Sequence, residues 1–260
     1  MISCRLAGGL GNLMFQIAGF EYIAHSSGLT RGYWNTDLAF RGLNIETDAN
    51  PNMKHANDYL TMFKNFHWPK CNKPETEVYV PFHYTPINAK DNVEYIGYFQ
   101  SEQYFPNREF ILNLFQPSDN VNKQILKYNK ILEGNTCSIH IRRGDYLKEK
   151  NSIHAVRGLD YYQKGITVIG EVDRYLIFSD DIHWCKQNFI GDKFVFIENE
   201  KDYIEIFLQS MCNHNIISSS SFSWWGAYLN NKNNRKIVGP KDWFTNLMKN
   251  NIMPKEWITI

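Results

Sequence analysis

The 260-residue sequence has little of what marks several common classes of protein. Its five cysteines are an odd number without a CxxC pair, so we expect neither a disulfide framework nor a zinc site. The net charge is only +1 and the Lys and Arg residues are scattered, which argues against a nucleic-acid partner. No apolar run approaches the ~20 residues that span a membrane, and the first residues do not resemble a signal peptide. We therefore expect a cytoplasmic protein without a transmembrane segment.

Signatures of several enzyme classes are also missing. No GK[ST] follows the glycine-rich stretch "GGLGN" (8–12), so a Walker A phosphate loop is excluded. The sequence contains no HExxH and no spaced set of histidines, which leaves no motif for a metal. The serine-rich stretch lacks the GxSxG pattern of a nucleophilic serine.

What the sequence does contain is an alternation of short β-type runs with helical patterns, which predicts an α/β fold with parallel sheets. At the N-terminus a strand over 2–7 precedes a glycine turn and a helix over 13–28, with Gly28 as the expected C-cap. Later strands are expected at 93–105, continuing into a helix start, and at 136–142, 174–181, 193–198, 215–221 and 236–240. Helices are expected at 106–116, 117–134, 159–171, 182–189, 202–214 and 221–231.

The composition changes near residue 135, which predicts two α/β lobes, 1–135 and 136–260, with the active site between them. Residues 32–92 are rich in Asn, Pro and aromatic residues, and their weak periodicity predicts no particular structure.

Polar clusters follow several of these strands, at the carboxyl ends where open parallel sheets bind ligands. In "SIHIRRGDYL" (138–147), His140 and Arg142 are expected on the opposite face from the isoleucines. Arg142 and Arg143 offer planar forks that suit a diphosphate, and Asp145 can orient a guanidinium or accept a proton. An arginine–aspartate brace is the structural alternative, and the density of the cluster favours a functional role.

The other clusters leave more alternatives open. "GGLGN" is compatible with a tight turn or with an anion cradle at a helix N-terminus. In "FSDD", Asp180 is expected to hydrogen-bond a base or a sugar, and Asp181 to cap the next helix; a metal site is disfavoured. The serine turn in "SSSSFSWW" suits a phosphate, and we expect Trp224 and Trp225 in the core, with sugar stacking as the alternative.

Taken in order, "GGLGNLMFQIA", "HIRRGDY", "FSDD" and "SSSSFSWWGAYL" resemble the inverting α-1,2-fucosyltransferases of glycosyltransferase family 11, and the resemblance covers essentially the whole chain. It implies a GT-B-like fold of two Rossmann-type lobes with the active site in the cleft between them. The N-terminal lobe would lie on the acceptor side and the C-terminal lobe would bind GDP-fucose. The implied reaction moves L-fucose from GDP-β-L-fucose to the 2-hydroxyl of a terminal β-galactose, without a metal or other cofactor.

The resemblance also implies which residues act. The expected catalytic residues are Arg142, Asp145 and His140. The expected donor-binding residues are Gly9, Gly11, Asn12, His140, Arg142, Arg143, Asp180, Glu205, Ser219, Ser220, Ser221 and Phe222. The sequence departs from the family at Leu13, where Gln is usual, and at Glu205, where Asp is the commoner acid.

The acceptor is expected to be a galactose-terminated oligosaccharide, free or lipid-linked, as in O-antigen biosynthesis. Peripheral association with the inner membrane is compatible with this. A non-catalytic carbohydrate-binding protein is the main alternative, but it would have no use for a two-arginine cluster. A glycoside hydrolase needs two separated carboxylates flanking the bond, and Asp180 and Asp181 are adjacent.

Overall fold

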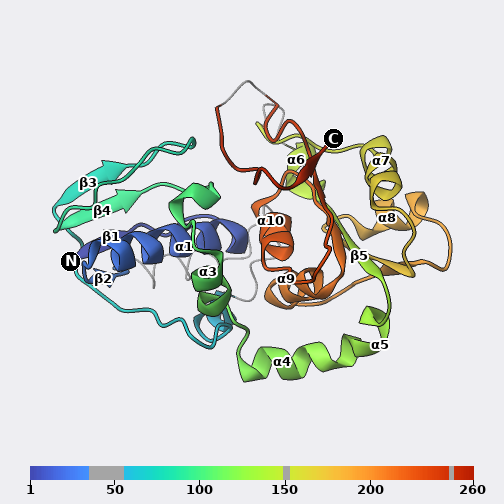
Figure 1. The fold of residues 1–260 in the computed structure, drawn as a ribbon, viewed down its shortest axis with the longest axis horizontal. Coiled ribbons are helices and arrows are strands. Elements are labelled where there is room, and N and C mark those ends of the chain that lie inside the picture. The colour runs from blue at the N-terminus through green and yellow to red at the C-terminus, as the bar shows by residue number, and fades with distance from the viewer. Residues whose placement is uncertain (35–55, 149–152, 246–248) are drawn as a thin grey trace. The chain divides into compact units, whose positions relative to one another are not determined.

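The computed structural model describes residues 1–34, 56–148, 153–245 and 249–260, and the chain forms two compact units (Figure 1). Unit 1 comprises residues 1–120 together with 249–254, and unit 2 comprises 121–248 together with 255–260. Among the described residues, no helix is long and apolar enough to cross a membrane.

Unit 1 is built on a parallel sheet in the order β2-β1-β4-β3. Its strands are β1 (Ile2–Cys4), β2 (Arg31–Gly32), β3 (Thr76–Tyr79) and β4 (Val93–Ile96). Helix α1 (Leu10–Ser27) runs alongside this sheet (Figure 1) and is buried along most of its length. The helix ends where Gly28 adopts φ 66°, and the N–H of Gly28 donates to the carbonyl oxygens of Ala24 and His25. The predicted glycine C-cap is therefore confirmed.

Within the described part of unit 1, the other helical segments are short: η2 (Ala56–Leu60), η3 (Glu102–Tyr104) and α3 (Arg108–Leu114). A late segment of the chain, Lys249–Pro254, also belongs to this unit. Its Asn251 side chain accepts a hydrogen bond from the backbone N–H of Tyr84 at 2.9 Å, and its Ile252 is fully buried.

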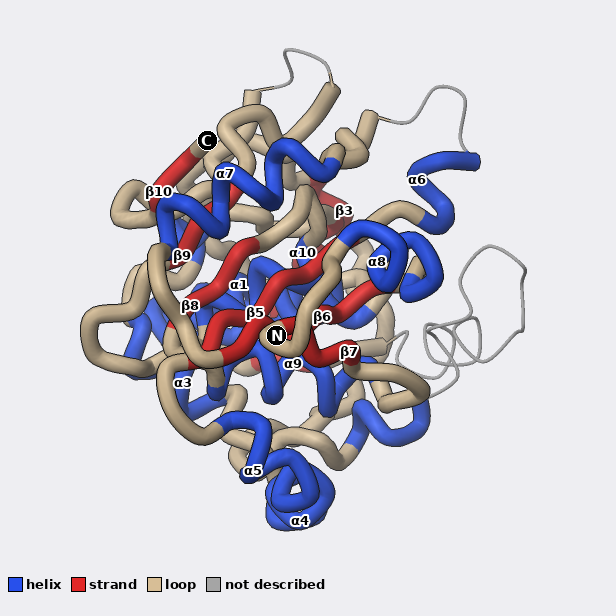
Figure 2. The backbone as a smooth tube through the Cα atoms, turned by 90° about the vertical axis from the view of Figure 1, so that its right-hand side faces the viewer, coloured by secondary structure: helices blue, strands red, loops and turns tan. Residues whose placement is uncertain are grey.

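Unit 2 contains a six-stranded parallel sheet in the order β10-β9-β8-β5-β6-β7. Figure 2 shows the central strands side by side, with α7 in front of the sheet and α9 behind it. The strands are β5 (Thr136–Ile141), β6 (Arg174–Ser179), β7 (Phe194–Phe196), β8 (His214–Ile216), β9 (Ile237–Gly239) and β10 (Ile258–Thr259). The helices are α4 (Asp119–Ile125), which begins just before the division, η4 (Leu126–Tyr128), α5 (Asn129–Leu132), α6 (Gly144–Lys148), α7 (Leu159–Ile169), α8 (Ile182–Asn188), α9 (Asp202–Met211) and α10 (Ser221–Tyr228).

Strand β5 is the centre of unit 2 and is buried on both faces. On one face Cys137, Ile139 and Ile141 join an apolar cluster with Tyr161 and Tyr162 of α7. On the other face the smaller polar residues of β5 find hydrogen-bond partners, as when Asn215 of β8 donates to the Ser138 hydroxyl at 2.7 Å. Because the polar side chains on this face form hydrogen bonds, they can be buried next to the site described below.

The division between the units differs from the boundary predicted at residue 135. Val121 and Ile125 of α4 are buried, and the Tyr128 hydroxyl donates to Glu200 at 2.7 Å. Lys127 forms an ion pair with the same carboxylate at 2.6 Å. These contacts attach the segment before β5 to unit 2, and no change in composition marks that attachment.

Other elements also differ from the prediction. The stretch "GGLGN" is less a turn than a helix start, because α1 begins at Leu10. The helix predicted over 117–134 is broken into α4, η4 and α5, and β10 was not predicted. Of the unassigned residues 32–92, positions 35–55 lie outside the described residues.

Helices α9 and α10 approach so closely that the glycine of "WWGAY" has a packing role. An added Cβ at Gly226 would lie 2.7 Å from the Cβ of Gln209 in α9. At Gly165 of α7, a Cβ would lie 3.0 Å from the Cγ2 methyl of Ile216. The first contact is shorter than real Cβ contacts allow, whereas the second requires a shift of only a few tenths of an ångström.

We therefore expect Gly226→Ala to lower the free energy of unfolding by about 1–3 kcal/mol, as overpacking does. Gly165→Ala is the matched control, because the gain of about 1 kcal/mol in helix propensity offsets a milder clash. Urea unfolding of both variants checks this difference. Equal losses in the two variants would show that the α9–α10 contact is not the tighter of the two.

Candidate active site

In the sheet of unit 2, the order in which the chain adds strands reverses between β5 and β8. Strands β6 and β7 lie on one side of β5, and β8, β9 and β10 lie on the other. Open α/β sheets bind ligands at the carboxyl ends of the two strands that flank such a reversal. Here these strands pair in parallel with Ile139 opposite Ile216, so the segments after β5 and β8 emerge at the same edge. They are the segments that contain "HIRRGDY" and "SSSSFSWW".

His140 joins the two segments. Its Nδ1 lies 2.9 Å from the hydroxyl oxygen of Ser218, and its ring centroid lies 5.3 Å from that of Phe222. Burial, together with the nearby charge of Arg142, lowers the pKa of His140 to about 3. The imidazole is therefore neutral at physiological pH, which makes it a hydrogen-bonding and packing group rather than a base.

Arg142 is bound by two carboxylates. Its Nη2 lies 2.8 Å from Asp145, and its Nε lies 3.1 Å from Asp180. Burial opposes the charge of this guanidinium, but the two carboxylates outweigh it and raise the pKa of Arg142 overall. The side chain also lies over the ring of Tyr146, with 5.4 Å between guanidinium carbon and ring centroid. These contacts fix the guanidinium at the end of β5.

Arg143 is held in a different direction. Its Nε lies 3.1 Å from Asp181, and its guanidinium carbon lies 4.1 Å from the ring centroid of Trp184. Asp181 also accepts a hydrogen bond from the backbone N–H of Trp184 at 3.1 Å, so the predicted cap of α8 is confirmed. The "FSDD" aspartates therefore order the loop after β5, with Asp180 accepting a further bond from the Arg143 N–H at 2.9 Å.

The serine turn after β8 leads directly into α10. Ser219 and Ser220 are buried, and Ser220 is the N-cap residue of α10, which starts at Ser221. The Tyr146 hydroxyl donates to the Ser219 carbonyl at 3.2 Å, so this turn is tied to α6. Trp224 and Trp225 are fully buried, which confirms the prediction that they belong to the core.

Glu205 lies in the first turn of α9, also in unit 2. Burial raises its pKa well above the ordinary value, and the negative charges of Asp202, Glu200 and Asp180 raise it further. Among the described residues its carboxyl group has no hydrogen-bond partner. A desolvated carboxyl group without a protein partner is a site for a ligand that presents N–H groups.

Gly9, Gly11 and Asn12 lie in unit 1, at the start of α1. Gly8 has φ 84°, and a Cβ there would lie 2.6 Å from the Asn12 amide nitrogen, so a glycine is required before this motif. The Asn12 side-chain oxygen accepts a hydrogen bond from Gln100 at 2.9 Å. This contact joins the segments that follow β1 and β4, the two neighbouring strands at the centre of the unit 1 sheet.

Sequence reasoning missed the residues that brace this edge of unit 1. The buried Gln16 side chain accepts from the N–H of Ala7 at 3.0 Å and donates to the Gly97 carbonyl at 3.1 Å. Phe99, just before Gln100, is buried and has φ 54°, a strained conformation for an aromatic residue. In unit 2 it missed Ser218 as the partner of His140, and Arg157, which contacts Ser219. Gln16 and Ser218 lie inside quoted motifs, but nothing in the sequence shows their partners, and Phe99 and Arg157 lie outside every motif.

Comparison with known proteins identifies the family. The model of "Glycosyl transferase family 11" matches residues 1–260. The chain belongs to glycosyltransferase family 11. This confirms the resemblance seen in the sequence motifs, and it makes the chain a glycosyltransferase.

Two curated relatives of this family 11 glycosyltransferase match over its full length. An alpha-1,2-colitosyltransferase from Escherichia coli is 35% identical and is covered over 99% of its own length. The O-antigen biosynthesis glycosyltransferase WbnK, also from Escherichia coli, is 31% identical and fully covered.

Among solved structures, the NodZ alpha-1,6-fucosyltransferase of Bradyrhizobium, soaked with GDP-fucose, has a TM-score of 0.55. It is 11% identical to the family 11 chain, and the match covers 88% of this chain and 92% of NodZ. At that identity the likeness concerns the fold, and it confirms the predicted GT-B-like α/β architecture.

The low pKa of His140 makes the stability of this family 11 enzyme depend on pH. The folded chain resists protonation of His140 until the pH nears 3, whereas the unfolded chain takes up the proton near 6.5. The stabilising contribution is therefore complete above about pH 6.5 and is lost progressively as the pH falls below it.

Between pH 7.5 and 5 we expect the wild type to lose roughly 2 kcal/mol more free energy of unfolding than His140→Asn loses. Urea unfolding at the two pH values measures this difference. Parallel losses in the two proteins would mean that His140 titrates normally in the folded chain.

Proposed function

We propose that the chain transfers L-fucose from GDP-β-L-fucose to the 2-hydroxyl of a terminal β-galactose, with inversion and without a metal. The observation that carries this proposal is the constellation at the β5–β8 pair, where His140 contacts the 218–222 turn and Arg142 follows at the end of β5. Membership of family 11 supports sugar transfer, and the relative named as an alpha-1,2-transferase supports the linkage. The NodZ structure soaked with GDP-fucose supports the donor.

In this proposal unit 2 binds the donor and unit 1 recognises the acceptor. As the acceptor oxygen attacks C1 of fucose, the bond to the β-phosphate breaks and negative charge grows on the departing GDP. Arg142 and the N–H groups at the start of α10 are fixed before the reaction and stabilise that charge. We propose metal independence because the nearby acids Asp145, Asp180 and Asp181 are already paired with arginines.

Glu205 is proposed to bind the guanine base. Guanine presents a ring N–H and an exocyclic amino group on one edge, and both are hydrogen-bond donors. The Glu205 carboxyl lacks a partner among the described residues, and its raised pKa reflects a desolvated position that such donors would satisfy. A preference for guanine over pyrimidine diphosphates follows from this contact.

The general base is proposed to be Asp145. The low pKa of His140 makes the imidazole a poor proton acceptor, whereas Asp145 is partly exposed beside Arg142. Its carboxylate would take the proton of the galactose 2-hydroxyl as the new bond forms.

A second donor is favoured by one specific observation, the similarity to an alpha-1,2-colitosyltransferase. Colitose is fucose without its 3-hydroxyl, so the two sugars would use the same diphosphate and base contacts. A site that hydrogen-bonds the 3-hydroxyl rejects the deoxy sugar strongly, whereas an apolar site discriminates weakly. The contacts that select the donor sugar are therefore distinct from those that bind its nucleotide.

For the acceptor, the relation to an O-antigen biosynthesis glycosyltransferase supports a galactose-terminated, lipid-linked oligosaccharide. We propose that the enzyme works in the cytoplasm, at the inner surface of the membrane that carries this acceptor.

The central test is sugar transfer to lactose from GDP-fucose and from GDP-colitose, with and without EDTA. We expect an α-1,2-fucosylated product, identified by NMR, in an amount that chelation does not change. Faster transfer from GDP-colitose would replace fucose by colitose in the proposal. Absence of GDP binding would reject the donor site and favour a non-catalytic carbohydrate-binding protein.

The role of Asp145 is tested by Asp145→Asn, which keeps the shape and removes the proton acceptor. We expect kcat to fall by about 100-fold or more, while the Kd for GDP changes little. Near-normal turnover would exclude Asp145 as the base. A parallel loss of GDP affinity would instead make it a support for Arg142.

A further inference from the structure

The arginines of "HIRRGDY" are already neutralised by neighbouring acids. Arg142 is paired with Asp145 and Asp180, and Arg143 with Asp181. Two guanidinium groups therefore face three carboxylates, so this cluster as a whole offers no net positive charge to a diphosphate. A pocket that binds such an anion needs a further cation.

Arg157 supplies a cation of this kind. It precedes α7, and its Nε and Nη2 lie 3.2 and 3.0 Å from the hydroxyl oxygen of Ser219 in the turn before α10. Its Nη2 also donates to the carbonyl oxygen of Asp242, and its guanidinium carbon lies 5.8 Å from the ring centroid of Tyr161. All of these partners are neutral groups.

Among the described residues, no carboxylate forms an ion pair with Arg157. A guanidinium has five N–H donors, and the contacts of Arg157 use those on Nε and Nη2, which leaves the two on Nη1 without a described partner. Burial lowers the pKa of Arg157, and the opposing effects of Tyr161, Tyr162 and Asp242 offset this only in part. An anion at this position would relieve that cost.

The position of Arg157 matches the remaining parts of the proposed donor site. Ser219, its partner, also accepts a hydrogen bond from Tyr146 through its carbonyl oxygen, and the ring of Tyr146 lies against Arg142. Arg157 thus contacts the serine turn directly, from the segment before α7, whereas Arg142 is connected to it through Tyr146.

We infer that Arg157 binds the diphosphate of the sugar-nucleotide donor, as a cation at the Ser219 turn that pairs with no described carboxylate. This inference rests on the proposed function and adds a residue that no motif marks. Arg157 is a binding residue in this role: its Nη1 faces the phosphate oxygens while Nε and Nη2 remain on the Ser219 turn.

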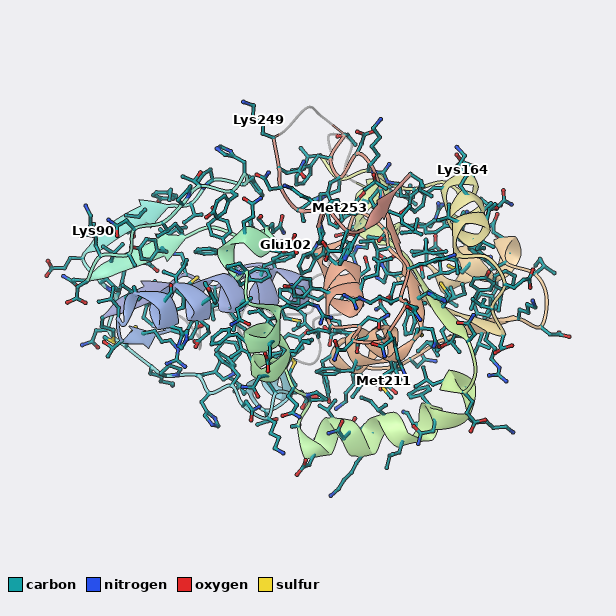
Figure 3. All side chains as sticks on the ribbon, viewed as in Figure 1. Lys90, Glu102, Lys164, Met211, Lys249 and Met253 are labelled. Carbon is teal, nitrogen blue, oxygen red and sulfur yellow. The ribbon has the colours of Figure 1, made fainter. Side chains whose placement is uncertain are left out.

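The experiment compares the binding of GDP and of guanosine, because only GDP carries the diphosphate. Isothermal titration is carried out on the wild type, Arg157→Gln, Arg157→Lys and Lys164→Gln. Lys164→Gln is a matched control because it also removes one positive charge. Lys164 lies on the exposed side of α7, and its side chain points away from the body of the protein (Figure 3).

For Arg157→Gln we expect the Kd of GDP to rise by about 10- to 100-fold, as for the loss of a charge-assisted hydrogen bond. The Kd of guanosine should stay the same. Arg157→Lys should recover part of the GDP affinity, because it keeps the charge but not the planar fork. Lys164→Gln should bind both ligands like the wild type.

An equal loss for GDP and guanosine would overturn the inference, because it would mean that Arg157 only holds the Ser219 turn to the segment of Asp242. Unchanged GDP affinity in Arg157→Gln would overturn it as well. Should Arg157→Gln fail to fold, Arg157→Lys alone decides, with a weakened Kd for GDP and an unchanged Kd for guanosine as the expected result. A wild type that binds no GDP would reject the proposed function itself, and this outcome is distinct from the others.

Discussion

The parallel pairing of β5 with β8 is the constraint on which the candidate site depends. The two strands are far apart in sequence, with two strand–helix units between them, yet Ile139 stands opposite Ile216 in the sheet. Side chains that follow the two strands therefore meet without any loop having to reach across the molecule. The hydrogen bond between the side chains of His140 and Ser218 connects the ends of the two strands. Burial keeps the imidazole neutral, so the junction adds no charge of its own.

The ion pairs around Arg142 and Arg143 serve positioning more than net attraction. Partly buried arginines would be poorly placed if they were free to rotate, and the two aspartates that follow β6 hold each one in a single direction. The same pairing weakens their attraction for an anion, because opposite charges nearby reduce the field of each guanidinium. In such a donor site, the paired arginines Arg142 and Arg143 give a fixed geometry, and Arg157, which has no described carboxylate partner, gives the positive potential.

The sequence predicted those features that arise from local patterns. Alternating strands and helices, the clusters at strand ends, the Gly28 cap, the Asp181 cap and the buried tryptophans all follow from short stretches of chain. What escaped prediction depends on contacts between distant residues. The attachment of Tyr128 to Glu200, the bridge from Gln16 to Gly97 and the contact of Arg157 with Ser219 each join segments that no periodicity connects. The strand β10 is too short to show a pattern, and it forms because β9 offers an edge.

The last described segment of the chain has a consequence for the order in which the enzyme can be built. Residues 249–254 complete unit 1, and β10 then adds the outer strand to the sheet of unit 2. Neither unit has all its parts until these residues leave the ribosome, although most of unit 1 is synthesised first. The nascent chain must therefore carry an unfinished N-terminal unit, because the hydrogen bond from Tyr84 to Asn251 cannot form before Asn251 is synthesised. Most of unit 2 is thus synthesised before unit 1 can be completed.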